Sequence, residues 1–164
     1  MTKLDELRES AQRIADGLGG GKLIPLRRSN HCTTDPVVRY KEMKQPVAKW
    51  KGNTPIPDSA WHLPSVSQAR VGLQLYEVSV LDCDDPHELW REHEDMLRET
   101  CPYAVKTPNG YHFYTEESLR GHAVPPWVDC FRHPHSNFVI AEGSVMGGFG
   151  KYERFWGSPS DIIR

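Results

Sequence analysis

The stretch SVLDCDDP, residues 79–86, decides how the rest of the chain is interpreted. Its apolar start and acidic end predict a buried strand that finishes in carboxylates and leads into a helix. Side chains alternate along a strand, so Asp82 and Asp84 are expected on one face and the apolar residues on the other. Two ionised carboxylates on one face repel each other unless a cation lies between them. A hard divalent ion such as Mg²⁺, bound by a few carboxylates and substrate phosphates, would meet that need.

The residues that follow carry a helix start signal. Asp85 can serve as the N-cap, Pro86 suits the first helical position, and Glu88 can complete a capping box. An apolar stripe then predicts that the helix runs to about Glu99. The alternative interpretation makes the acidic cluster nothing more than a helix cap. Asp85 can do that alone, which leaves the other two carboxylates to be explained.

Size and composition predict one soluble domain over residues 1–164. The net charge of −2 gives no general support to nucleic-acid binding, so any such binding must use a local basic patch. The four cysteines are widely spaced without a C-x-x-C pair, which is typical of cytosolic free thiols. The charged N-terminus does not resemble a secretory signal, and no apolar run approaches the roughly 20 residues of a membrane span. We therefore expect a cytoplasmic protein with no membrane partner.

The first part of the chain predicts a helix, a short strand and a long loop. Residues 2–16 have an apolar face at helical spacing with Thr2 as N-cap, residues 23–26 form the strand, and residues 27–67 are rich in proline. A glycine run precedes Lys22, but no Ser or Thr follows this lysine as a phosphate loop requires. The glycines are interpreted as a helix stop and turn.

The long loop holds the main basic segment of the chain. Four lysines stand around Trp50, namely Lys41, Lys44, Lys49 and Lys51. An aromatic ring among lysines can stack on a base while the ammonium groups meet phosphates. A tryptophan packed under a surface loop explains the same residues equally well.

Residues 103–107 and 111–114 predict a hairpin, because Asn109 and Gly110 between two apolar runs are a strong hairpin signal. The hairpin would bring Lys106 and His112 to the same end of a sheet.

Residues 127–131 and 137–141 predict a further pair of strands, and the glycines at 143, 147, 148 and 150 predict a loop-rich C-terminal part. The first of these strands carries Asp129. If Asp82, Asp84 and Asp129 converge, they can hold one or two Mg²⁺ or Mn²⁺ ions. Two ions about 3.5–4 Å apart favour in-line phosphoryl displacement, the chemistry of nucleotidyl transfer.

The order of these motifs resembles the primase–polymerase domain of the archaeo-eukaryotic primase superfamily. That family's first motif, hydrophobic-Asp-hydrophobic-Asp, is matched by LDCD at 81–84. Its second, a small residue, any residue and then His, is matched by GYH at 110–112, and its third, a hydrophobic residue before an acid, by VD at 128–129. The similarity extends to LIPL at 23–26, KQP at 44–46 with Trp50, and VIAEGS at 139–144.

The resemblance implies an α/β (α+β) fold. An RRM-like catalytic sheet with helices, residues 71–164, would pack beside an N-terminal αβ module, residues 1–70. It also implies a metal site for Mg²⁺ or Mn²⁺ made by Asp82, Asp84 and Asp129, with His112 on the triphosphate of a nucleotide. Three further residues would line the nucleotide pocket, namely Lys106, Thr107 and Asn109.

The implied activity is that of a DNA primase/polymerase, which makes or extends primers from nucleoside triphosphates on a single-stranded or primed DNA template. Such domains serve phage or plasmid replication as well as cellular replication, which for a virus or plasmid places the protein in the host cytoplasm. A helicase or a C-terminal helical domain often accompanies them in a longer protein.

Three other interpretations stay open. The first is a nucleotide- or DNA-binding module without turnover. The second is a zinc site, although four ligands at compact spacing are not evident. Its ligands would be Cys130, His133 and His135, with Cys32, His31 or Cys101. The third resembles rolling-circle nickases and would use His133, His135 and Tyr152, but it leaves Asp82 and Asp84 unexplained.

Overall fold

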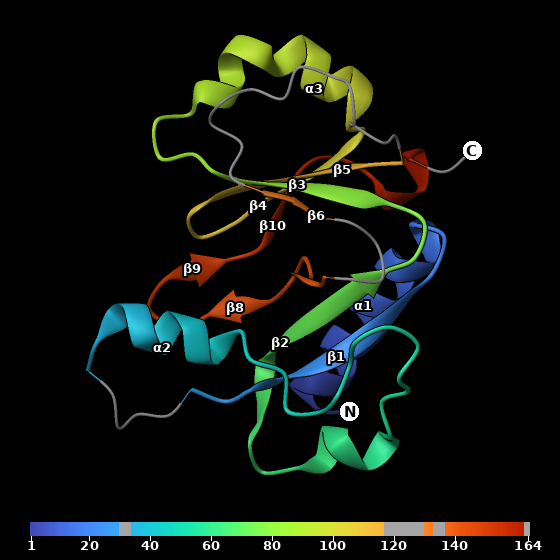
Figure 1. Ribbon diagram of the computed structural model, residues 1–164, viewed down its shortest axis with the longest axis vertical. Helices are drawn as coiled ribbons and strands as arrows, with labels where there is room; N and C mark the ends of the chain where they lie inside the picture. The colour runs from blue at the N-terminus through green and yellow to red at the C-terminus, as the bar shows by residue number, and fades with distance from the viewer. Residues whose placement is uncertain (30–33, 117–129, 133–136, 163–164) are drawn as a thin grey trace.

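A computed structural model describes residues 1–29, 34–116, 130–132 and 137–162, with the backbone alone for 130–132. Helices and antiparallel strands are combined in layers, so the predicted α+β class is confirmed at that level (Figure 1). The elements are α1 (Lys3–Gly17), β1 (Gly21–Arg27), α2 (Pro36–Met43), η1 (Asp58–His62), β2 (Val66–Leu75), β3 (Ser79–Asp84), η2 (Leu89–His93), α3 (Glu94–Thr100), β4 (Tyr103–Lys106), β5 (Gly110–Thr115), β6 (Cys130–Arg132), β7 (Val139–Ile140), β8 (Val145–Met146), β9 (Gly150–Lys151), β10 (Glu153–Gly157) and η3 (Pro159–Asp161).

A five-stranded sheet in the order β10-β4-β5-β3-β6 is the centre of the fold. Alternation along its strands gives it two faces. The outer face buries Leu81 and Phe113 against Trp90 and Leu97, which come from η2 and α3. The inner face carries Val80, with Val105 and Tyr114, and packs toward the rest of the chain. The predicted strand at residues 79–84 and the predicted hairpin of β4 and β5 are both confirmed.

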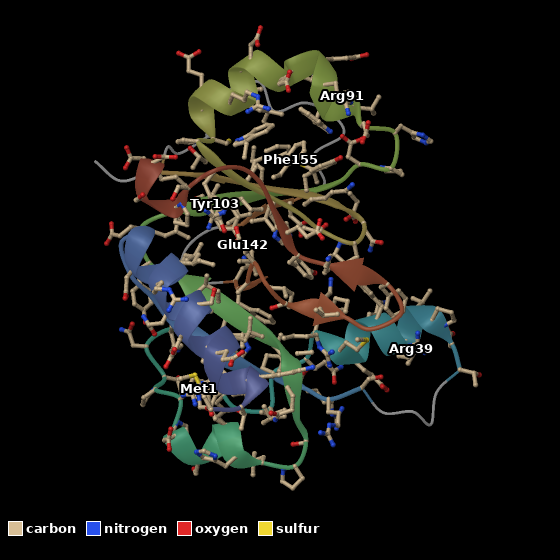
Figure 2. All side chains as sticks on the ribbon, turned by 180° about the vertical axis from the view of Figure 1, so that it is seen from behind. Met1, Arg39, Arg91, Tyr103, Glu142 and Phe155 are labelled. Atoms are coloured by element: carbon tan, nitrogen blue, oxygen red, sulfur yellow. The ribbon has the colours of Figure 1, made fainter. Side chains whose placement is uncertain are left out.

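A three-stranded sheet, β1-β2-β7, lies below the first one in Figure 1, and α1 lies behind it. The predicted helix and its cap are confirmed, since the Thr2 hydroxyl accepts a hydrogen bond from the Asp5 N–H at 3.1 Å. Between the two sheets the Tyr103 hydroxyl donates to the Glu142 carboxylate at 3.1 Å, and these two side chains lie close together in Figure 2. Arg154 donates to both oxygens of the same carboxylate, at 2.8 and 3.2 Å.

The predicted loop at residues 27–67 is wrong in part, and the C-terminal part, predicted to be loop-rich, also contains short strands. Helix α2 begins within the loop region, where Asp35 caps it by accepting from the Val37 N–H at 2.9 Å, and Pro36 occupies its first turn. Near the C-terminus, β10 pairs with β4 at the edge of the five-stranded sheet. Neither short element has a strong pattern of its own, and each is stabilised by contacts from distant parts of the chain.

The predicted helix start at Asp85 is also wrong. The Asp85 carboxylate accepts from the N–H groups of Leu89 and Trp90, both at 2.9 Å, so the chain makes a turn before η2 begins at Leu89. Glu88 has a left-handed φ of 53° and takes no part in a capping box. Its carboxylate instead accepts from Arg91 at 2.9 Å and from the Tyr111 hydroxyl at 3.2 Å. Asp85 therefore orders the β3–η2 connection, as expected of a capping residue.

Residues 127–131 and 137–141 are expected to form a pair of strands, but β6 and β7, the strands found there, do not pair with each other. β6 joins β3 in the five-stranded sheet, whereas β7 joins β2 in the other. The expected division at residue 70 falls inside β2, and β7 returns from the second half of the chain to complete the first sheet. Within the described ranges, no helix is long and apolar enough to cross a membrane.

Gly110 is required where β5 approaches the end of β3. A Cβ at this position would lie 1.9 Å from the Cys83 carbonyl oxygen and 2.7 Å from the Asp85 nitrogen. We expect Gly110→Ala to lower the free energy of unfolding by at least about 2 kcal/mol, measured by urea denaturation. Gly147→Ala is the control, because nothing lies within 4 Å of its Cβ position, and it should change stability by less than about 0.5 kcal/mol. Equal stability of the two variants would contradict the described β3–β5 approach.

Candidate functional site

Asp82 and His112 face each other across the β3–β5 pair. The register places them directly opposite, and the Asp82 Oδ1 and His112 Nε2 atoms are 3.3 Å apart. The His112 side chain is 7% exposed and that of Asp82 is 21% exposed, so the imidazole is covered while the carboxylate still reaches solvent. The structure thus brings together two of the sequence-predicted site residues, on the inner face.

Asp84 follows on the same face, one alternation further along β3, and it is exposed. Its partner in the register is Gly110, which has no side chain to cover it. The two carboxylates differ in surroundings, because Asp82 contacts a buried imidazole and Asp84 lies at the open end of the strand. This matches the alternation expected from the sequence.

A cavity of about 120 Å³ lies beside Asp82 and His112. Its wall comes from both sheets and from the segment after α2, and includes Lys44, Trp50, Phe138 and Tyr152. Trp50 and Phe138 meet edge to face with ring centroids 4.9 Å apart. The lysine and tryptophan that the sequence marked as basic and aromatic therefore line the same cavity as Asp82 and His112, which sequence spacing alone did not predict.

Two tyrosines, Tyr40 and Tyr152, lie near enough to the carboxylates to feel their charge. Tyr40 and Tyr152 share a hydrogen bond, and the Tyr152 ring centroid is 5.8 Å from that of His112. Burial, followed by the negative charges of Asp84 and Asp82, raises the pKa of Tyr40 against the opposing effect of that hydrogen bond. Burial also raises the pKa of Tyr152, with smaller contributions from Tyr40 and Asp82. The ammonium of Lys44 lies 4.5 Å from the Tyr40 ring centroid and brings a positive charge to the same place.

The second ring nitrogen of His112 has no hydrogen-bond partner among the residues that the structure describes. Its Nδ1 atom is fully buried, and an unsatisfied buried polar atom costs about 1–3 kcal/mol. Such an atom is suited to a ligand or a water molecule, since either would recover this free energy. His112 thus contacts Asp82 through one nitrogen, while the other nitrogen is buried without a partner in the described part of the chain.

The three remaining predicted pocket residues are placed differently. Lys106 is paired with Tyr111, whose ring belongs to the outer core, so it lies on the face opposite His112. The Thr107 hydroxyl accepts from the Gly110 N–H at 3.0 Å, and the Asn109 carbonyl accepts from the Asp85 N–H at 3.2 Å. These two groups therefore stabilise the turn between β4 and β5, and none of the three lines the cavity.

Asp129, the third predicted carboxylate, lies outside the described residues, as do the zinc candidates His31, Cys32, His133 and His135. Among the residues that the structure does describe, no group of three or more His, Cys, Asp or Glu side chains could hold a metal ion. Cys101, the remaining zinc candidate with a described side chain, is buried in the outer core.

Tyr152 is poorly suited to the role that a nickase would give it. Its side chain is 3% exposed and its pKa is raised, whereas a nucleophile must be accessible and able to lose its proton. The environment of Tyr152 instead suits a neutral wall residue that contacts His112.

Sequence reasoning missed Tyr40 and assigned Lys44 to a loop. The overlooked signal is the Asp35-Pro36 pair, which starts α2. Tyr40 lies on α2, and Lys44 directly follows the last residue of that helix. The two residues are four apart in sequence, a spacing that places both on one side of a helix.

Comparison of the chain with protein-family models, with curated proteins and with solved structures gave no match.

The buried tyrosines of the inner face predict alkaline unfolding. Burial raises the pKa of Tyr103, Tyr114 and Tyr152, so the folded protein retains protons that the unfolded chain releases above about pH 10. The free energy of unfolding should therefore be unaffected below about pH 10 and fall above it, by about 4 kcal/mol per pH unit for three tyrosines.

A pH titration that follows tyrosinate absorbance and far-UV circular dichroism together checks this expectation. The buried tyrosines should ionise only as the helical signal is lost, and Tyr114→Phe should reduce the slope by about one third. Complete tyrosinate formation in a protein with an unchanged circular dichroism spectrum would contradict it.

Proposed function

We propose that the chain catalyses metal-dependent nucleotidyl transfer, as a DNA primase/polymerase that makes or extends a primer from nucleoside triphosphates. The observation that carries the proposal is the partly exposed Asp82 carboxylate beside the buried His112 imidazole, one nitrogen of which has no partner within the described ranges. Both residues line a cavity that a lysine also lines. A carboxylate for a cation, and an imidazole and an ammonium for phosphate oxygens, are the groups that a triphosphate site needs.

The topology of the five-stranded sheet supports the same proposal. In chain order, β3, α3, the β4–β5 hairpin and β6 follow the strand, helix, hairpin and strand of a βαββαβ unit over the described residues. The spatial order β6-β3-β5-β4 places the first strand in the middle, as an RRM-like sheet does. The helix covers the outer face of the sheet, so the Asp82 and Asp84 side chains of β3 lie on the face that the helix leaves uncovered.

The residues fit a hard divalent cation. Asp82 and Asp84 share a face, both are accessible, and carboxylate oxygens suit Mg²⁺ and Mn²⁺. They would hold the ion together with Asp129. A bound ion would neutralise triphosphate charge and favour attack by a primer hydroxyl. His112 would donate a hydrogen bond to a phosphate oxygen, and Lys44, which lines the same cavity, would add a positive charge.

The strand that follows Asp129 is adjacent to Asp82, since Cys130 pairs with Asp82 in the register. Antiparallel partners share a face and neighbours in a strand alternate. A carboxylate at position 129 can therefore join Asp82 only if the chain leaves regular pairing before Cys130, which is where β6 begins. The proposal requires that departure.

The cavity is smaller than the roughly 300–1,000 Å³ that pockets for drug-sized ligands occupy. It would therefore take only part of a nucleotide, and its charged lining suits the phosphates. The base, the sugar and the template would lie outside it.

A nucleotide-binding module without turnover is the second candidate. It is favoured by the contact of Asp82 with His112, which engages a carboxylate oxygen that a metal ion would need. Such a module would bind nucleotide but never incorporate it.

Replacement of Asp82 by Asn tests the proposed function. Asn removes the charge but keeps an oxygen for the contact with His112, so we expect an unchanged melting temperature and a loss of primer extension of at least about 10²-fold. Extension of a primed DNA template is measured with dNTPs and with NTPs, in Mg²⁺ and in Mn²⁺. Asp95→Asn, an exposed carboxylate on α3, is the control and should extend at the parent rate.

Two results would contradict the proposal. Extension by Asp82→Asn at the parent rate would remove Asp82 from the site. Nucleotide binding by the parent without incorporation, even in Mn²⁺, would instead favour the second candidate.

A further inference from the structure

We propose that the groove formed by residues 46–54 binds single-stranded nucleic acid and leads it to the cavity beside Asp82. The groove is an open surface depression of about 590 Å³, and Lys49, Trp50 and Lys51 are among its lining residues. This inference rests on the proposed function only where it identifies the bound strand as the template.

Trp50 joins the groove to the candidate site. It is the residue that lines both the 590 Å³ groove and the 120 Å³ cavity. A strand lying in the groove would therefore reach Asp82 and His112 past a single indole ring. The ring is half-buried, which leaves part of it available for stacking.

The charge of the groove differs from that of the whole chain. The protein has 20 basic and 22 acidic residues, but the segment from Lys44 to Pro57 contains three lysines and no Asp or Glu. Lys49 and Lys51 are exposed and flank Trp50 directly. A local positive charge beside an aromatic ring is the combination that binds a phosphate backbone and stacks a base.

The groove is held in shape by Lys22 of β1. Its ammonium donates to the carbonyls of Trp50, Gly52 and Thr54, the last two at 3.1 and 2.6 Å. Gly52 turns the chain with a φ of 62°, between the two outer carbonyls. Because three bonds and the Phe138 contact hold this segment, less conformational entropy is lost on binding than for an unrestrained loop.

A single strand suits this groove better than a duplex. Its unpaired bases expose their faces to an aromatic ring, whereas a duplex keeps its bases stacked on each other. The groove contains one such ring between two lysines, so it would hold a short length of strand.

Binding of a fluorescently labelled oligothymidine, followed by anisotropy without metal or nucleotide, tests the groove. We expect Lys49→Gln with Lys51→Gln to weaken binding about tenfold and to reduce the slope of log K against log salt by about 1.4. The matched control is Lys3→Gln with Arg13→Gln, which removes the same charge from exposed positions on α1. An equal loss of oligothymidine affinity in the two double variants would overturn the proposal that the groove binds the strand.

Trp50 is tested by a second readout, because Trp50→Ala also removes the Phe138 contact and can destabilise the fold. Oligothymidine should quench the tryptophan fluorescence of the parent, and Trp50→Phe should lose most of this quenching while it keeps most of the affinity. Unchanged quenching in Trp50→Phe, or equally tight binding of a blunt duplex of the same length, would overturn stacking in the groove.

The failure of this inference is distinguishable from that of the proposed function. If the parent extends primers in an Asp82-dependent way and the two double variants bind oligothymidine equally, the proposed function stands and the groove proposal is wrong. If the parent never extends a primer, but oligothymidine binding is weakened only in the Lys49 and Lys51 double variant, the proposed function is wrong and the groove stands as a binding surface.

Discussion

The antiparallel pairing of β3 with β5 is the constraint on which the rest of the site depends. Leu81 and Phe113 are opposite each other and buried against α3, and the next pair along is Asp82 with His112. A slip of one residue would turn the carboxylate and imidazole into the outer core, where neither could be solvated. Packing of the outer face therefore sets the register, and the register places two polar groups side by side on the inner face.

The inner face can form a cavity because other elements are held against it. Arg70 is buried on β2, and its guanidinium donates to the carbonyls of Arg27, Met43 and Val145, at 2.7, 3.0 and 3.5 Å. Burial lowers its pKa to about 10, so it stays charged at neutral pH and keeps these charge-assisted bonds. Through it β1, the end of α2 and β8 are tied together. The bond to Met43 at the end of α2 holds Tyr40 and Lys44 near an acidic strand far away in the sequence.

Local signals predicted local structure unevenly. The Asp-Pro pair at 85–86 predicts a helix start, but the Asp85 carboxylate accepts from the N–H groups of Leu89 and Trp90 and orders a turn first. The same pair at 35–36 does begin a helix, although the proline-rich stretch around it favours a loop. The hairpin of β4 and β5 was predictable because its turn and both strands are contiguous in sequence. The placement of β6 and β7 in different sheets was not, since nothing local to either strand identifies its partner.

The sequence by itself determined the acidic strand, the hairpin, the first helix and the alternation that puts Asp82 and Asp84 on one face. These depend on side-chain period and turn chemistry, which act over a few residues. Only the tertiary structure decided that His112 contacts Asp82, that Lys106 lies on the opposite face, and that Lys44 and Trp50 complete the cavity. Those outcomes depend on register and on packing between sheets, and both are set by the burial of residues distant in the chain.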